Sequence, residues 1–346
     1  MPSLIPEILS DIGNELIENK DSNAINRFAL SGKMPFQTMI KLFSSVETLE
    51  IHEMHYIIGW GAKCFRIDFE FTEPPLKFLL NCSGNLITRF YIKNYFSNAQ
   101  QKMYQPIFDK IIAQKQLITF TISDDIYKCN TALFDEFLIH FSSTLKNLSI
   151  PSKCLTPKFR DSFNLESLTI VDFVDDRLLL FCCKTSSLTL TFDQSPLKKY
   201  KKFFLQNHRN GPSLFSINEL ILDYTNDCFC LLNFGCFENC MKFFPSIKLM
   251  KFNVSFKSLD NIQSIILYCT KFINGSIKVP TKVIIEFKRQ KGAICLGYHR
   301  CKEICTDFET YESNSKFYCF RRIVLTAGNE STIFEVQLPK WNLRLI

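Results

Sequence analysis

The chain has 346 residues, of which 46% are hydrophobic and 22% charged, and its formal net charge is +7. This is enough material for a large buried core, in one elongated domain or two compact ones, and it excludes a linker, a collagen or a disordered tail. Phe accounts for 35 residues and Gly for only 11, which disfavours folds that wrap phosphates in glycine-rich loops.

Residues 1–45 are expected to form three short helices. The first should begin at Pro6, the second should have Ser22 as its N-cap and end at Gly32, and the third should begin near Pro35. Apolar residues at helical spacing mark the first helix: Ile8, Leu9, Ile12 and Leu16. Three helices this short would not be stable alone, so we expect them to pack on the rest of the chain, on a partner, or on both.

From residue 46 onward, a pattern of three apolar residues recurs, with the second three positions and the third five positions after the first. The copies are Val46/Leu49/Ile51, Cys64/Ile67/Phe69, Ile87/Phe90/Ile92, Leu117/Phe120/Ile122, Leu145/Leu148/Ile150, Leu165/Leu168/Ile170, Leu188/Leu190, Ile217/Leu220/Leu222, Ile247/Met250/Phe252 and Ile262/Ile265/Leu267. The last two positions of each copy alternate with polar or small residues, as in a β-strand.

Helical spacing occurs between several copies, for example at Tyr104, Ile107, Phe108 and Ile111. A strand followed by a helix or an irregular return every ~20–30 residues is the unit of a leucine-rich repeat, and stacked units share one core. The predicted fold class is therefore α/β, with an irregular leucine-rich-repeat solenoid over residues 46–290. A generic α/β domain remains the alternative, because the spacing is irregular.

Residues 291–346 are expected to form a C-terminal cap. Residues 317–325 and 332–338 are strand-like, and residues 327–331 suit a hairpin loop between them. Such a hairpin would cover the open edge of the last repeat, or it would contribute to substrate binding.

Catalytic signatures are missing from the sequence, so we expect no enzyme, no catalytic residue and no cofactor. His52 and His55 have the wrong spacing for a zincin helix and are read as partly exposed histidines at the end of a strand. Two groups of cysteines are candidate zinc ligands, namely Cys228/Cys230/Cys236/Cys240 and Cys295/Cys301/Cys305/Cys319 around His299. Their spacing favours buried thiols over a metal site.

Location and polyanion binding are also constrained by the sequence. An export signal is not expected, because the acidic residues Glu7 and Asp11 lie where its basic and apolar regions would be. No apolar run approaches the ~18 residues of a membrane span. We therefore expect a cytoplasmic or nuclear protein with reduced thiols. Basic residues are scattered, which disfavours nucleic-acid binding. The one dense basic run, residues 198–202, is interpreted as a solvated loop, with a nuclear import signal or a phosphate-binding patch as the alternatives.

The first residues of the chain resemble an F-box. Ile5-Pro6-Glu7-Ile8-Leu9-x-x-Ile12 is similar to the F-box opening, and the second half is similar in Asp21, Ile25, Phe28-Ala29-Leu30, Lys33 and Phe36. The resemblance covers roughly 40 residues, and an F-box followed by leucine-rich repeats is a known family architecture.

The resemblance implies that residues 1–45 bind the adaptor subunit of a cullin–RING ubiquitin ligase, while the repeats hold an unknown protein substrate. It implies an apolar docking surface made of Ile5, Pro6, Ile8, Leu9 and Ile12, supported or joined by Leu30 and Phe36. The expected function is non-catalytic substrate recruitment. The alternative is a leucine-rich-repeat interaction scaffold unconnected to ubiquitination, with residues 1–45 acting as a helical cap whose apolar stripe is hidden.

Overall fold

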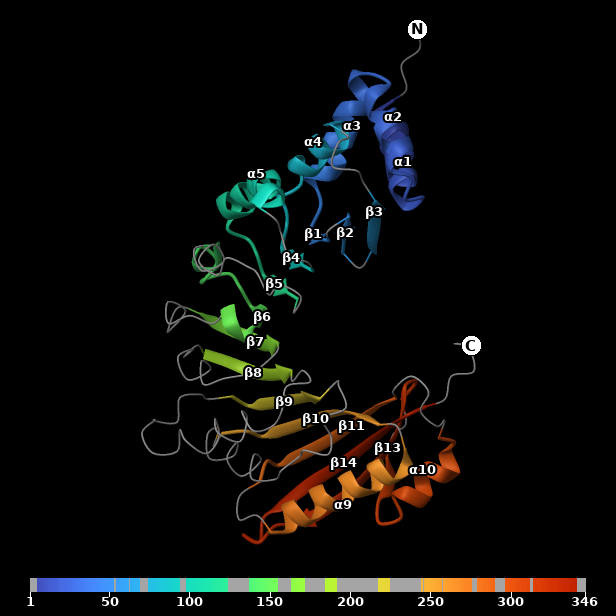
Figure 1. Ribbon diagram of the computed structural model, residues 1–346, viewed down its shortest axis with the longest axis vertical. Coiled ribbons are helices and arrows are strands. Elements are labelled where there is room, and N and C mark those ends of the chain that lie inside the picture. Colours follow the sequence, from blue (N-terminus) through green and yellow to red (C-terminus); the bar gives the residue numbers. More distant parts are fainter. Residues whose placement is uncertain are drawn as a thin grey trace. The chain divides into compact units, whose positions relative to one another are not determined.

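The computed structural model describes residues 5–52, 54–61, 63–68, 74–93, 98–123, 137–154, 163–171, 184–191, 217–224, 244, 246–256, 258–275, 279–289, 296–311 and 314–340. These residues form a mixed α/β structure, which confirms the predicted class. The chain divides into two compact units, residues 1–164 and 165–346, whose helices and strands are labelled in Figure 1.

The first unit opens with three helices, which we call the head: α1 (Pro6–Glu18), α2 (Ser22–Leu30) and α3 (Lys33–Ser44). The three predicted helices are thus confirmed. Pro6 begins α1, as its fixed φ allows. The cap of α2 is Asp21, one residue before the predicted Ser22, and its carboxylate accepts a hydrogen bond from the Ala24 N–H at 2.9 Å.

The head is tied to the sheet of the first unit where α1 ends and α2 begins. Glu18, which ends α1, lies 3.5 Å from Lys63, and the Ser22 hydroxyl donates to the carbonyl of Asp68. Both partners belong to strand β3 (Lys63–Asp68). Gly13 allows α1 and α3 to approach closely, because a Cβ at this position would lie 2.6 Å from the Leu42 side chain.

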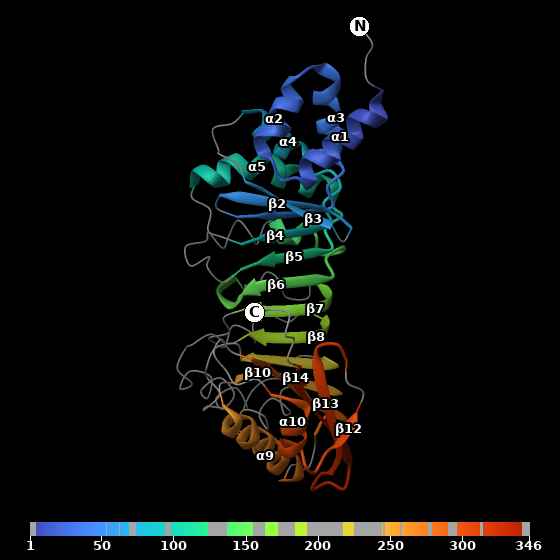
Figure 2. The same ribbon diagram turned by 90° about the vertical axis from the view of Figure 1, so that its right-hand side faces the viewer.

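The sheet of the first unit combines parallel and antiparallel strands in the order β6-β5-β4-β1-β2-β3. Its remaining strands are β1 (Thr48–Ile51), β2 (His55–Trp60), β4 (Arg89–Ile92), β5 (Thr119–Ile122) and β6 (Asn147–Pro151). Neighbours among β1, β4, β5 and β6 are parallel, whereas β2 and β3 are antiparallel. Helices α4 (Pro74–Cys82) and α5 (Asn98–Gln114) precede β4 and β5, and the 3₁₀ turn η1 (Ser152–Cys154) follows β6 (Figure 2).

The core of the first unit is built from the predicted apolar triplets, aligned in register. Leu49 pairs with Phe90 and Phe90 with Phe120, while Ile51 pairs with Ile92 and then Ile122. These side chains are buried. The rings of Phe90 and Phe120 lie 5.7 Å apart, and Phe108 of α5 and Phe137 pack on them as an aromatic cluster.

A shared hydrogen-bond pattern recurs where the parallel strands begin. The carbonyl preceding one strand accepts two N–H groups from the start of the next, at 2.8–3.1 Å. The accepting residues are Glu47, Thr88, Ile118 and, in the second unit, Asn218. The same local geometry therefore starts strands in both units.

The second unit has longer strands in the order β12-β13-β14-β11-β10-β9-β8-β7. They are β7 (Asn164–Val171), β8 (Lys184–Thr191), β9 (Glu219–Tyr224), β10 (Leu249–Phe256), β11 (Lys282–Arg289), β12 (Glu309–Tyr311), β13 (Phe317–Leu325) and β14 (Ser331–Pro339). Neighbours among β8, β9, β10, β11 and β14 are parallel, and β12 and β13 are antiparallel. The predicted C-terminal hairpin is confirmed as β13–β14.

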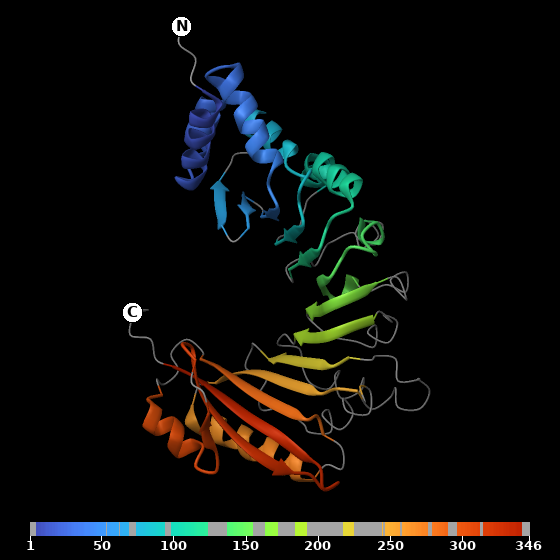
Figure 3. The same cartoon turned by 180° about the vertical axis from the view of Figure 1, so that it is seen from behind.

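Helices α9 (Leu259–Gly275) and α10 (Tyr298–Ile304) cover one face of these strands (Figures 1 and 3). The buried side of α9 carries Ile262, Ile265, Ile266, Cys269 and Ile273. The prediction of a repeat strand at Ile262/Ile265/Leu267 was therefore wrong. The spacing of three between Ile262 and Ile265 fits a helix face as well as it fits the triplet pattern.

The copy at Cys64/Ile67/Phe69 also needs correction. Cys64 is exposed and lies on β3, an antiparallel strand, and Phe69 is outside the described residues. Antiparallel pairing of β2, β3, β12 and β13 makes each sheet mixed, unlike the uniform parallel sheet of a leucine-rich-repeat solenoid. The structure thus bears out the α/β class and the register of most triplets, without identifying leucine-rich repeats.

Candidate functional site

An apolar patch lies at the end of the head that faces away from β3. Because α1 ends and α2 begins beside β3, the start of α1 and the α2–α3 turn are brought to the opposite end. Ile5, Pro6 and Ile8 are exposed there on α1, and Leu30 is 68% exposed at the end of α2. Large exposed aliphatic side chains at one end of a helix bundle are typical of a docking surface.

Three predicted docking residues have a different place. Leu9 is only 3% exposed and packs inside the head, so its assignment to the docking surface is corrected. Consecutive helix residues are about 100° apart around the axis, so Leu9 points towards α3 although its neighbour Ile8 is exposed. Ile12 and Phe36 are half-buried. Each therefore packs partly inside the head and leaves part of its side chain at the surface.

Two residues that the sequence reading missed extend the patch. Met34 is exposed in the first turn of α3, and Phe78 of α4 is exposed while its ring stacks on Phe36 with centroids 5.5 Å apart. Phe78 lies far outside the resembling segment, so only tertiary packing could reveal it. We call Ile5, Pro6, Ile8, Leu30, Met34 and Phe78 the head patch.

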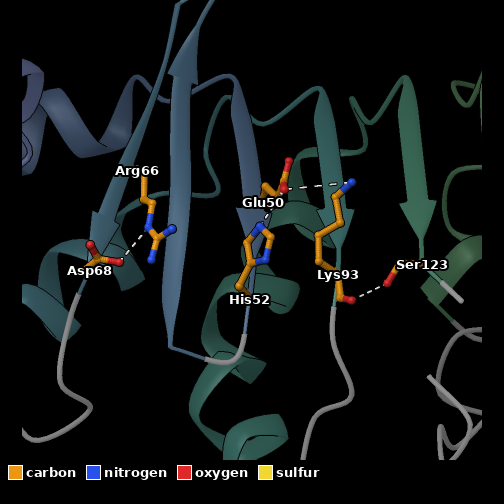
Figure 4. Close-up of polar contacts among 6 residues, drawn as sticks. All are labelled: Glu50, His52, Arg66, Asp68, Lys93 and Ser123. Atoms are coloured by element: carbon orange, nitrogen blue, oxygen red, sulfur yellow. Dashed lines mark hydrogen bonds and ion pairs between the residues drawn. The ribbon is translucent and has the colours of Figure 1, made fainter. Parts of the chain in front are cut away.

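A second candidate is the open face of the first unit's strands, where polar side chains lie on β1 and β3 and just after the ends of β1 and β4 (Figure 4). His52 Nε2 lies 2.6 Å from Glu50 Oε1, and Lys93 Nζ lies 4.0 Å from the same oxygen. On β3, Arg66 donates to Asp68 at 2.8 Å. The carboxylates of Glu50 and Asp68 are thus paired with basic side chains nearby, which fits a hydrogen-bonding surface rather than a site with excess charge.

His52 and His55 close the turn between β1 and β2, as expected of partly exposed histidines at a strand end. Their rings stack with centroids 4.0 Å apart, and the His52 N–H donates to the His55 carbonyl at 3.0 Å. Burial lowers the pKa of His55, and the neighbouring His52 and Arg66 lower it further. Both rings therefore pack most favourably when at least His55 is neutral.

The cysteines described by the structure are free thiols, and most are buried, as predicted. Burial raises the pKa of Cys301 to about 11 and that of Cys305 to about 12, which keeps both protonated at neutral pH. Within the described ranges no three His, Cys, Asp or Glu side chains are grouped to hold a metal ion. The cluster at residues 228–240, Cys295 and the basic run at 198–202 lie outside the described residues.

No protein-family model matches the chain, and no curated protein matches it. Among the described helices, none has both the length and the apolar character needed to cross a membrane.

Proposed function

We propose that this protein is a non-catalytic recruitment subunit of a cullin–RING ubiquitin ligase. The head would dock the adaptor subunit through the head patch, and the parallel strands, as a divergent leucine-rich-repeat array, would carry a protein substrate. The single observation behind the proposal is an exposed apolar patch on the same segment that resembles an F-box, namely Ile5, Pro6, Ile8 and Leu30.

The exposure of these side chains favours docking over a purely structural cap. A helical cap that only seals the neighbouring strands would keep its apolar residues inside. In the head, Leu9, Ile17 and Ile25 are inside, whereas Ile8 and Leu30 remain in solvent. Burying two such side chains against a partner would contribute about 1.5–3 kcal/mol each.

Tethering is the mechanism that this arrangement supports. A partner held at the head and a substrate held on the strands would share one chain, which raises the effective concentration of each near the other. No bond is made or broken by this protein, because the transfer chemistry would belong to other subunits. The proposal implies a cytoplasmic or nuclear location.

Binding of the purified adaptor subunit to the full chain, measured by calorimetry, tests the proposal. We expect micromolar or tighter binding, weakened at least about tenfold by Ile8→Asp and by Leu30→Asp, because a buried charge without a partner is costly. Ile118→Asp is the matched control: Ile118, the residue just before β5, is 43% exposed, as is Ile8.

Absence of adaptor binding by the unsubstituted chain would overturn the proposal and leave the plain interaction scaffold. Equal loss of binding in Ile8→Asp and Ile118→Asp would also contradict it, since the head patch would then have no special part. Circular dichroism of each variant separates lost docking from lost folding.

A further inference from the structure

The outer surface of α1 carries two neighbouring stripes of different chemistry. Ile8 and Ile12 lie on one side of the helix, and Ile5 precedes them in the head patch. At about 100° per residue, the acidic residues of α1 fall together on the adjacent side. These residues are all exposed and form what we call the acidic stripe, namely Glu7, Asp11, Glu15 and Glu18.

The acidic stripe is neutralised at one end. Helix α1 contains no basic residue of its own. Glu18, at the end next to β3, lies 3.5 Å from Lys63. In the part of the chain that the structure describes, Glu7, Asp11 and Glu15 form no ion pair. Negative charge therefore remains along the part of α1 that borders the head patch.

Basic residues of the first unit near the head lie on other elements. Lys20 follows the end of α1, on the side that meets β3, and Lys33 begins α3 beside Met34 of the head patch. The others are Arg27 of α2, Lys41 of α3 and Lys77 of α4. The charges of the head are therefore separated by helix, with carboxylates on the α1 side and cations on the α2, α3 and α4 side.

The spacing of the carboxylates makes them repel one another in the free protein. Asp11 is four positions from both Glu7 and Glu15, so the three side chains lie on successive turns of one helix face. Like charges at this spacing destabilise a helix. The helix dipole favours Glu7, which is in the first turn, but not the two that follow. Asp11 and Glu15 are thus unfavourable for α1 by itself and become favourable when a cation lies against them.

We propose that the head patch and the acidic stripe together dock a partner surface made of aliphatic residues with lysine or arginine along one side. The aliphatic residues would cover Ile5 and Ile8, and the cations would pair with Asp11 and Glu15. Opposite charges at the border of an apolar contact fix the orientation of the partner and speed its association. This inference rests on the proposed function and names the charge of the adaptor surface that α1 would meet.

The acidic stripe also argues against other occupants of this surface. A nucleic acid or an anionic lipid headgroup would be repelled by the carboxylates that border Ile8. A second copy of the chain docked through the same surface would bring carboxylates and not cations to the stripe. A protein surface with its own basic residues is therefore the occupant that the charges favour.

Two amphipathic helical peptides test the surface without the adaptor. Both carry leucine on one face, and the residues beside it are lysine in one peptide and glutamate in the other. Anisotropy with the full chain should give at least about tenfold tighter binding of the lysine peptide, although the chain has a net charge of +7. The affinity should fall as salt rises. Equal binding of the two peptides, or tighter binding of the glutamate peptide, would overturn the proposal.

Asp11→Lys separates docking from stability, because the two should change in opposite directions. It replaces two repulsive pairs, with Glu7 and with Glu15, by attractive ones, so the urea midpoint should rise. Binding of the lysine peptide should nevertheless weaken at least about fivefold, since a cation now faces the cations of the peptide. A carboxylate with a purely structural role would give a lower midpoint instead.

Asp109→Lys is the matched control, because Asp109 is an exposed aspartate on α5 and the change in net charge is the same. It should leave binding of the lysine peptide unchanged. Unchanged peptide binding in Asp11→Lys, or equal weakening in the two variants, would contradict the proposal.

Binding of the purified adaptor distinguishes this inference from the proposed function. Adaptor binding that Asp11→Lys weakens would support both. Adaptor binding that Asp11→Lys leaves unchanged would reject only the basic partner surface. Selective binding of the lysine peptide without adaptor binding would reject only the ligase connection.

Discussion

Parallel strands in the first unit have four or five residues, whereas most of those in the second have eight or nine. The short strands place two core residues each on the buried face, as Leu49 and Ile51 do on β1. On β10 there are four: Met250, Phe252, Val254 and Phe256. The same apolar triplet therefore lies at the start of parallel strands in both units, and the longer strands of the second unit carry further core residues after it.

The two units differ in the side chains that their short and long strands place on each face. The short strands of the first unit pack against an aromatic cluster centred on Phe90, Phe120 and Phe137. Their open face carries exposed ion pairs such as Arg66–Asp68. The longer strands of the second unit carry a ladder of partly buried ion pairs on their open face, namely Lys251–Glu286, Lys282–Glu335 and Lys288–Asp223. A longer strand thus adds polar contacts as well as apolar ones, because successive residues alternate between the faces.

The largest expected effect comes from the aromatic cluster. Phe120→Ala removes a buried ring that lies 5.7 Å from Phe90 and 5.4 Å from Phe137, and it should cost the first unit about 3–5 kcal/mol of unfolding free energy. Urea unfolding followed by fluorescence measures this loss. Thr121→Ala, on the open face of the same strand, should cost far less, and equal losses would mean that the cluster is not the core.

Breaking the ladder should have the next largest effect. Lys282→Met leaves the buried Glu335 carboxylate without its cation, which should cost roughly 2 kcal/mol. Arg66→Met breaks a pair whose side chains are more than half exposed, so a change of about 0–1 kcal/mol is expected. Urea midpoints of the two variants test the contrast, and a larger loss for Arg66→Met would reverse it.

Substitution of two glycines of the first unit, Gly59 and Gly61, should give a smaller contrast in unfolding free energy than the two ion pairs do. A Cβ at Gly59 would lie 2.6 Å from the Lys63 carbonyl oxygen, so Gly59→Ala should cost about 1–3 kcal/mol through a forced backbone shift. Gly61 has φ +56 and open space around it, so Gly61→Ala should cost about 1 kcal/mol from backbone conformation alone. Thermal unfolding of both variants measures the two losses of stability. A larger loss for Gly61→Ala than for Gly59→Ala would contradict the prediction.

The smallest expected effect is a pH dependence of the first unit. The folded state lowers the pKa of His55 below its usual value of 6.5, so the unfolded chain binds more protons as the pH falls. Stability should therefore be complete above that value and decline as the pH drops through it. The groups facing His55 are His52, Arg66, Asp68 and Glu50.

His55→Gln should flatten this decline, whereas His140→Gln, which alters an exposed histidine of the same unit, should not. Urea midpoints measured between pH 7.5 and 5.5 give the comparison. A decline that is the same in both variants would assign the pH dependence to other groups.

Sequence periodicity predicted the head helices, the β13–β14 hairpin and most of the strand register, because these depend on the spacing of apolar residues within one segment. It failed at Ile262 and Ile265, where a spacing of three suits a helix. The F-box resemblance, not the periodicity, put Leu9 on the docking surface, and Leu9 is buried because its side of α1 meets α3. The head patch could be anticipated in part: Ile5, Pro6, Ile8 and Leu30 were identified, whereas Phe78 required the packing of α4 on α3.

The order of residues by itself determined that short strands recur and that Leu49, Phe90 and Phe120 belong to a common core, since alternation along a strand is a local property. Only the tertiary structure decided which polar residues meet. Lys282 and Glu335 are 53 positions apart, and no local pattern links them. The pairing of β11 with β14 brings them within 2.7 Å, because strand neighbours are chosen by the packing of the whole sheet.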